Sequence, residues 1–242
     1  MQIVGVILLA VVVWYGFSER EQTAITAFDS HAFVMVLGGT TAAILVSSSA
    51  LTTLRTLLCL REAIPFAGAL GPVTQRMEAE RAQLVELWAE GRRAQAVQLA
   101  EGSRFPAVRQ LLELVLKRAS AEEAQAVFTE LKHQEILRWQ PAIGNWELLS
   151  RLAPSFGMVG TITGMIQLFR NMGEDNLDIG SALSLALVST LYGVAFGAGI
   201  AGPFGHFLRG MLEERLGVLE RCEDNVGDLV TRSARASVGG AE

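Results

Sequence analysis

Residues 153–165 read APSFGMVGTITGM and contain one proline, three glycines, two threonines and one serine, but no charged side chain. They lie within a longer apolar block, 146–169, whose charged residues are near its N-terminal end. A block of this length and composition is typical of a membrane-spanning helix. The stretch therefore raises the question of why a span contains so many helix-weakening and hydroxyl residues.

The chain has 242 residues, and half of them are hydrophobic. These apolar residues gather in four blocks. The blocks are 3–17, 31–51, 146–169 and 179–208. They predict four membrane spans, although 3–17 is short for a spanning helix, which needs about 20 residues. We interpret 3–17 as a span, because neither a basic segment before it nor a small-residue cleavage site after it indicates a signal peptide.

The basic residues predict the orientation of these spans. Of the 20 Lys and Arg residues, 12 lie in 52–145 and five follow Leu208, whereas the connections 18–30 and 171–180 are acidic. Basic segments stay in the cytoplasm, so both termini and 52–145 are predicted to lie on the cytoplasmic side of the membrane. The predicted domains are 1–51 (spans 1 and 2), 52–145 (cytoplasmic insertion), 146–208 (spans 3 and 4) and 209–242 (cytoplasmic helix and disordered tail).

The insertion is predicted to be helical, which makes the fold class all-α. Ser120 and Glu123 form an S-x-x-E capping box. Pro106 is placed near a helix start, and Gly91 is placed to end a helix. An imperfect apolar stripe follows the capping box, at Ala124, Val127, Phe128, Leu131, Ile136 and Leu137. The last ten residues, 233–242, are predicted to be disordered.

Composition and motifs argue against several function classes. The net charge is −5 and no basic stripe with interleaved aromatics occurs, which argues against nucleic-acid binding. Only Cys59, Cys222 and three histidines are available, which argues against a disulfide framework or a metal site. No phosphate-binding loop or catalytic triad is recognisable, so we expect neither an enzyme nor a cofactor.

Small residues recur at helical spacing in the last two blocks. Pro154, Gly157, Thr161 and Gly164 share one face of a helix, as do Thr190, Gly193 and Gly197. One interpretation is close helix packing, with each threonine bonding the carbonyl four residues before it. The other interpretation is an ion path, because hydroxyls inside a membrane can coordinate a cation or hold water.

The prolines favour the ion path, but the absence of an acid limits it. A proline in a helix frees the carbonyl four residues before it, so Pro154 would free that of Ser150 and Pro203 that of Gly199. Ion transfer across a bilayer normally needs a carboxylate or a histidine, and the central parts of the four blocks contain neither. The uncharged face is therefore expected to receive a partner helix that supplies the acid.

Several motifs together resemble the MotA and PomA flagellar stator subunits of the MotA/TolQ/ExbB channel family. They are APSFGMVGT at 153–161, NM at 171–172, ALVSTLYG at 186–193 and VLGGT at 36–40. The resemblance implies a homopentamer in the lipid bilayer of the bacterial inner membrane, around a MotB-like single-span partner that carries the missing Asp. Flux of H+ or Na+ through this complex would drive torque on the flagellar rotor switch protein.

The resemblance also implies roles for individual residues. The ion path and its gating would involve Pro154, Thr161, Thr190 and Pro203, with Thr161 favouring Na+. Helix packing would involve Gly157, Gly160, Gly164, Gly193 and Gly197. The family's rotor contact uses an Arg and a Glu eight residues apart, which gives Arg93 and Glu101, or Arg92 in a shifted alignment.

The sequence is also compatible with other functions. One alternative is a TolQ- or ExbB-type motor, which energises envelope processes. Such motors typically have one span before the large cytoplasmic segment, whereas two spans are predicted there in this chain. A MotA-like motor for gliding, secretion or defence would have the same channel sequence. A membrane scaffold without transport would need the proline and threonine positions to tolerate alanine.

Overall fold

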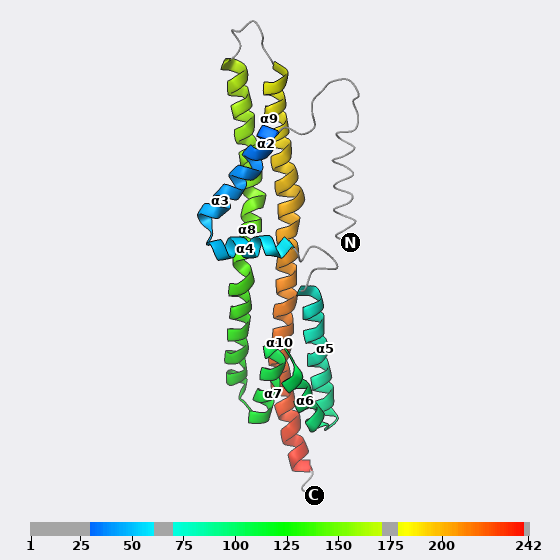
Figure 1. Ribbon diagram of the computed structural model, residues 1–242. Coiled ribbons are helices and arrows are strands. Elements are labelled where there is room, and N and C mark those ends of the chain that lie inside the picture. The colour runs from blue at the N-terminus through cyan, green and yellow to red at the C-terminus, as the bar shows by residue number, and fades with distance from the viewer. Residues whose placement is uncertain (1–29, 61–69, 171–178, 240–242) are drawn as a thin grey trace, which may run out of the picture. The chain divides into compact units, whose positions relative to one another are not determined.

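The computed structural model describes residues 30–60, 70–170 and 179–239, and these residues form helices with no strand among them (Figure 1). The prediction of an all-α protein is therefore confirmed for this part of the chain. The chain divides into two compact units, Met1–Thr56 with Ala142–His206 and Leu57–Pro141 with Phe207–Glu242. The assignment of the first unit to the membrane and of the second to the cytoplasm stays a prediction.

The first unit contains the apolar helices. The segment α2 (Ser30–Phe33), η1 (Val34–Gly38) and α3 (Gly39–Ser47) runs as one helix with a π-helical turn in its middle. A short helix, α4 (Ala50–Leu58), follows. The C-terminal part of α8 (Ala121–Arg170) packs beside α9 (Ile179–Val194), which continues through the π-helical η3 (Ala195–Ala201) into α10 (Gly202–Gly239).

Three helical segments in the described residues are long and apolar enough to cross a membrane. They are Ser30–Ser47 and parts of Ala121–Arg170 and Ala186–Thr231. The predicted first block, 3–17, lies outside the described residues. The predicted second span extended to Leu51, but its helix ends at Ser47 because Ser48 has an extended backbone, with φ −126° and ψ 150°.

The second unit is a helical bundle around one apolar core. It contains α5 (Leu70–Ala89), α6 (Arg93–Gly102) and α7 (Pro106–Lys117), with the N-terminal part of α8 and the C-terminal part of α10. Leu84, Leu111, Phe128 and Cys222 are among its fully buried side chains. Burial of such side chains supplies about 1.5–3 kcal/mol each, so this core holds the five segments together.

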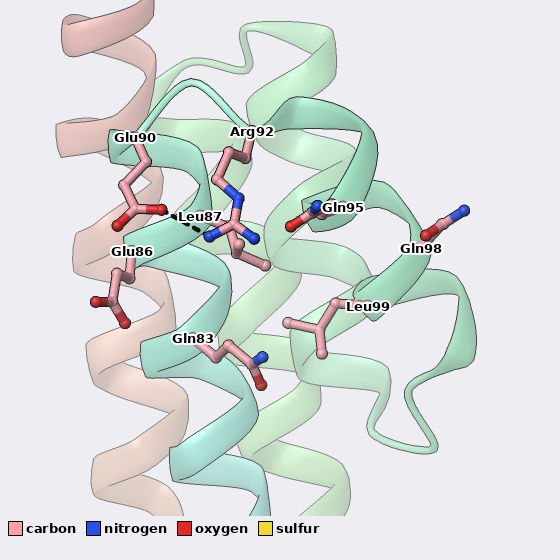
Figure 2. Close-up of a pocket in the computed structure, with 8 residues that line it drawn as sticks. All are labelled: Gln83, Glu86, Leu87, Glu90, Arg92, Gln95, Gln98 and Leu99. Atoms are coloured by element: carbon pink, nitrogen blue, oxygen red, sulfur yellow. Dashed lines mark hydrogen bonds and ion pairs between the residues drawn. The ribbon is translucent and has the colours of Figure 1, made fainter.

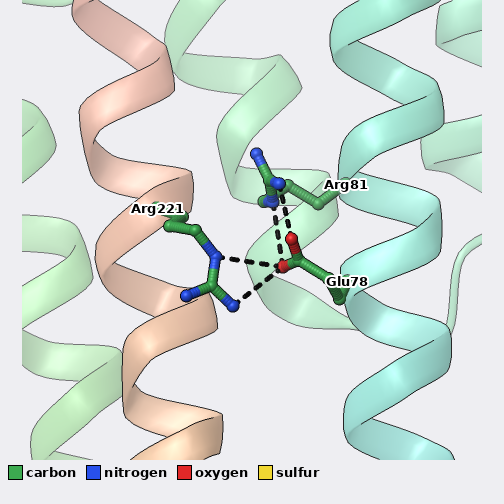
Figure 3. Close-up of polar contacts among 3 residues, drawn as sticks. All are labelled: Glu78, Arg81 and Arg221. Atoms are coloured by element: carbon green, nitrogen blue, oxygen red, sulfur yellow. Dashed lines mark hydrogen bonds and ion pairs between the residues drawn. The ribbon is translucent and has the colours of Figure 1, made fainter.

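Ion pairs fix α10 against its neighbours in this bundle. Arg221 on α10 contacts Glu78 on α5 at 3.2 Å, and Glu78 also pairs with Arg81 at 2.6 Å (Figure 3). On the α8 side, two further pairs involve α10: Lys132 with Glu223 at 2.8 Å and Glu135 with Arg215 at 2.9 Å. Because most of these groups are partly buried, they are screened less by salt than freely exposed pairs.

Local signals predicted the helix ends in this unit. The Ser120 hydroxyl oxygen accepts a hydrogen bond from the Glu123 amide at 3.2 Å, and the Glu123 carboxylate accepts one from the Ser120 amide at 2.9 Å. The capping box is therefore confirmed. Pro106 is the first residue of α7, and Gly91 follows the end of α5 with a φ of +77° that favours glycine.

Two expectations for the helices of the second unit were wrong in part. The tail 233–242 was expected to be disordered, but α10 continues to Gly239, and only 240–242 lie outside the described residues. The apolar stripe of α8 buries Ala124 and Phe128, whereas Leu137 is 58% exposed and Ile136 is 36% exposed. The helical period of about 3.6 residues rotates those two positions away from the core.

Candidate functional site

The predicted packing glycines bring the backbones of α8 and α9 into direct contact. A Cβ at Gly157 would stand 3.0 Å from the Ser189 carbonyl oxygen and 3.4 Å from the Cα of Gly193. A Cβ at Gly160 would overlap the Ser189 side chain. Gly164, one turn further along α8, is also buried. Only glycine permits this approach, because any side chain would push the two backbones apart.

Pro154 lies about one helical turn before Gly157 on α8, and it packs against Gly197. A Cβ at Gly197 would stand 2.7 Å from Cδ of Pro154 and 2.8 Å from the Ser150 carbonyl oxygen. Pro154 has no amide hydrogen to donate to that carbonyl, so the oxygen is free of the usual helix bond. This oxygen lies against Gly197 across the contact between α8 and the neighbouring helix.

Three hydroxyls gather between α8 and α9 about one helical turn from Gly157. Thr161 Oγ1 is hydrogen-bonded to Thr190 Oγ1, and it also lies 3.0 Å from the Ala186 carbonyl oxygen and 3.2 Å from that of Gly157. Thr190 Oγ1 lies 3.3 Å from the Ala186 oxygen, and Ser189 Oγ lies 3.1 Å from it. Hydroxyl and carbonyl oxygens thus converge in an apolar region, where they can bind a cation or water as well as each other.

The four predicted ion-path residues therefore do not form one cluster. Thr161 and Thr190 meet directly, and Pro154 sits about two turns from Thr161 along α8. Pro203 is the second residue of α10, is exposed, and follows the π-helical turn η3. The amide of Gly202 donates to the Gly197 carbonyl, so the chain around Pro203 bonds with the wider π-helical spacing.

Sequence reasoning missed three residues that belong to this region. Ser189 is fully buried within the hydroxyl cluster and occupies the space beside Gly160. Gly39 lets the ring of Phe156 lie against α3, since a Cβ there would stand 2.5 Å from the ring. Asn145 is 6% exposed and hydrogen-bonded on both sides of its amide. The glycine pair in VLGGT was the available signal for Gly39.

The predicted rotor residues lie on the second unit, around the turn between α5 and α6. Arg92 pairs with Glu90 at 3.0 Å and lines a groove of about 520 Å³ (Figure 2). The Arg93 guanidinium lies 5.4 Å from the centroid of the Trp88 ring, a cation–π contact. Glu101 is exposed near the end of α6 and is not among the residues that line the groove.

The described residues offer no cluster of metal-binding side chains. No group of three or more His, Cys, Asp or Glu side chains there could hold a metal ion. Cys59 and Cys222 are buried, and neither forms a disulfide. Burial raises the pKa of Cys222, in the helical bundle, to about 12, which leaves it protonated and unreactive at neutral pH.

Comparison with known proteins identifies the family. The sequence pattern of the MotA/TolQ/ExbB proton channel family matches residues 101–221, which is half of the chain. This chain belongs to that family. The resemblance inferred from the sequence motifs is therefore confirmed, and the apolar helices of this MotA/TolQ/ExbB family member are those of a multi-pass membrane protein.

Individual relatives of this family member match over shorter segments. Motility protein A of Aquifex aeolicus is 35% identical over 92 residues, which cover 38% of this chain and 33% of the relative. Chemotaxis protein PomA of Vibrio alginolyticus is 40% identical over 50 residues, 21% of this chain and 19% of the relative. The matched segment thus spans about a third of the length of the Aquifex protein.

Two solved structures have the same fold over nearly the whole chain. The C. jejuni MotAB structure matches with a TM-score of 0.78 at 14% identity, covering 95% of this chain and 88% of the matched chain. The flagellar MotAB stator complex of Bacillus subtilis matches with a TM-score of 0.74 at 20% identity, covering 94% and 88%. At these identities the likeness establishes the fold of this family member.

Proposed function

We propose that this chain is an ion-driven flagellar stator subunit of the bacterial inner membrane. It would form a channel for H+ or Na+ with a MotB-like single-span partner, as a homopentamer with four spans per subunit and both termini in the cytoplasm. The observation that carries the proposal is the α8–α9 contact, in which buried glycines bring uncharged segments of the two helices together beside Pro154 and the Thr161–Thr190 pair.

The chemistry of these two segments favours a partner. Within 153–169 and 179–205 the sequence has no carboxylate and no histidine, so these helices supply only hydroxyl and carbonyl oxygens to an ion. A partner helix with a carboxylate would supply the titratable group that ion transfer needs. The oxygens at Thr161 and Thr190 favour Na+ as the driving ion, since hard cations prefer oxygen ligands.

Torque would be transmitted by the second unit to the flagellar rotor switch protein. Arg92, Arg93 and Glu101 are exposed there, and exposed charges mainly govern the rate and specificity of association. The coupling energy would come from the ion gradient, at about 2.3 kcal/mol per charge and 100 mV. Relatives named Motility protein A and PomA favour a flagellar role over the alternative of a TolQ/ExbB-type or other non-flagellar motor.

Deletion of the gene tests this function. The host should lack any second gene of the family, and both flagellar filaments and swimming should be scored in single cells. We expect flagellated but paralysed cells that are rescued by the wild-type gene and by Ser155→Ala, an exposed neighbour on α8, but not by Pro154→Ala. Cells of the deletion strain that still swim, or rescue of full torque by Pro154→Ala, would contradict the proposal.

A further inference from the structure

The short helix α4 has a polar face and an apolar face, and it is the polar face that packs against the protein. Its threonines lie on the side that packs against the protein: Thr56 is 3% exposed, and Thr52 and Thr53 are half-buried. Its leucines lie on the outer side, where they are 54–59% exposed, namely Leu51, Leu54, Leu57 and Leu58. The helix thus buries hydroxyls and exposes hydrocarbon.

Hydrogen bonds to α8 fix α4 in this orientation. The Ser48 hydroxyl donates to Asn145 Oδ1 at 2.7 Å, and Asn145 Nδ2 donates to Thr56 Oγ1 at 2.8 Å. The Trp146 indole donates to the Thr56 carbonyl oxygen at 3.2 Å. Rotation of α4 to bury its leucines would break both bonds to Thr56 and leave the Asn145 side-chain nitrogen and the Trp146 indole without these acceptors, so the leucine face is held outward.

The outward orientation of the leucines indicates that lipid, not water, surrounds this face of α4. A helix on the surface of a water-soluble protein turns its apolar stripe inward and its polar side to solvent, which is the reverse of α4. The leucine face also follows directly from the second candidate span, whose last turn exposes Leu45 by 58% and Val46 by 90%. In a multi-pass membrane protein, that exposed surface of the span is covered by lipid.

We propose that α4 is an interfacial helix whose leucine face inserts into the bilayer where the second candidate span ends. Figure 1 shows α4 running crosswise to α3 and to the adjacent part of α8, as a helix in the plane of the interface would. Arg55 is exposed beside the leucines, and its long side chain reaches the lipid headgroups while its methylenes stay with the hydrocarbon. The occupant of this face is the lipid bilayer, not another protein chain.

Spin labels on α4 test the proposal in the full-length chain, purified with its bound partners and reconstituted into vesicles of phosphatidylethanolamine and phosphatidylglycerol. Both native cysteines are buried, so labels attach selectively to introduced cysteines. We label Leu51→Cys, Leu54→Cys and Leu58→Cys separately. Val46→Cys is the lipid reference, Gln98→Cys on the exposed surface of α6 is the water reference, and Thr53→Cys is the matched control on the opposite face of α4.

Collision of each label with oxygen and with a water-soluble nickel chelate reports its surroundings. We expect labels at the three leucine positions to collide with oxygen several-fold more than with nickel, as at Val46, and the Thr53 label to be shielded from both. Strong nickel collision at the leucine positions would mean that the face is in water. Weak collision with both reagents there would mean that a protein chain covers it. Either of these results would overturn the proposal.

Discussion

Gly193 lies against the backbone of Ala153, where a Cβ on the glycine would stand 2.5 Å from the Ala153 carbonyl oxygen. The same Cβ position is 3.1 Å from the Cα atoms of Gly157 and Pro154. Backbone atoms cannot rotate away as a side chain can, so α8 and α9 meet at a contact that one methyl group would disrupt. This contact sets the distance between the two helices. The Thr161–Thr190 hydrogen bond and the packing of Pro154 against Gly197 both depend on that distance.

Gly193→Ala should therefore destabilise the protein by about 1–3 kcal/mol, as overpacking of a close contact does. The measurement is thermal unfolding of the purified chain in detergent. Gly144→Ala is the matched control on α8, because nothing lies within 4 Å of its Cβ position and alanine is the better helix former. Equal stability of the two variants would show that α8 and α9 do not approach as closely as described.

Thr161→Val should reduce sodium-driven swimming, because it removes the Oγ1 that contacts Thr190 and two carbonyl oxygens while it keeps the side-chain volume. Thr161→Ser should retain function. Swimming speed is measured against external Na+ concentration at constant ionic strength. Thr163→Val is the control, since the hydroxyl of Thr163 bonds only the Val159 carbonyl of its own helix. An unchanged Na+ dependence in Thr161→Val would remove Thr161 from the ion path.

Arg93→Glu should impair rotation, with partial rescue by a compensating charge change on the rotor, if Arg93 contacts the rotor switch protein. Arg92→Glu is the comparison, because Arg92 is already paired with Glu90 at 3.0 Å and the two residues are adjacent. The measurement is the rotation speed of tethered cells. A defect confined to Arg92→Glu would assign the contact to the neighbouring position.

Glu78→Gln should destabilise the helical bundle by about 0.5–1 kcal/mol, the range for a partly exposed ion pair. Its hydrogen bond with Arg81 holds the pKa of Glu78 below the ordinary value of 4.5, and Arg221 adds to this effect. The folded state thus favours the ionised carboxylate, whose stabilisation is present above pH 4.5 and is lost as pH falls through the lowered pKa.

Urea unfolding of the wild type and of Glu78→Gln at a series of acidic pH values measures this difference. The two stabilities should converge as the pH falls below the lowered pKa, because the protonated wild type then lacks the same charge. A constant difference over the whole pH range would contradict an ionic origin.

Cys222 should make the folded state sensitive to alkaline pH. Its pKa is raised by burial to about 12 from an ordinary value of 9.0, so above pH 9 the unfolded chain loses a proton that the folded chain keeps. The free energy of unfolding should then fall by about 1.4 kcal/mol per pH unit until the folded thiol ionises. Cys222→Ala should lack this part of the pH dependence, which the difference between the two unfolding profiles isolates.

Thiol reactivity gives an independent measurement of the same property. The folded Cys59→Ser variant should react slowly with maleimide at pH 8 and rapidly in denaturant, because its remaining thiol, Cys222, is fully buried and protonated. Rapid reaction in the folded state would show that the thiol is accessible.

Local chemistry made several features predictable from the sequence. The capping box at Ser120 and Glu123, the start of α7 at Pro106 and the turn at Gly91 each depend on residues a few positions apart. The spacing of glycines in the third and fourth blocks likewise predicted two small-residue faces. The family could be inferred from motifs for the same reason, since they are contiguous in the chain.

Long-range contacts were beyond the reach of these patterns. The sequence did not indicate that Gly39 receives Phe156 or that Asn145 bonds to both Ser48 and Thr56, because these partners are far apart in the chain. It also did not indicate that α8 would run through Pro154 as one 50-residue helix. Pro154 packs against Gly197 of the neighbouring helix at the level where α8 lacks the hydrogen bond that the proline removes.

The sequence by itself therefore determined the helical class, the apolar segments and the residue types on each helix face, because these follow from hydrophobic periodicity and local capping. Only the tertiary structure decided which faces meet. It paired Thr161 with Thr190, enclosed Ser189 and turned the leucines of α4 outward. Helix register depends on the fit of two surfaces, and no single helix sequence contains that fit.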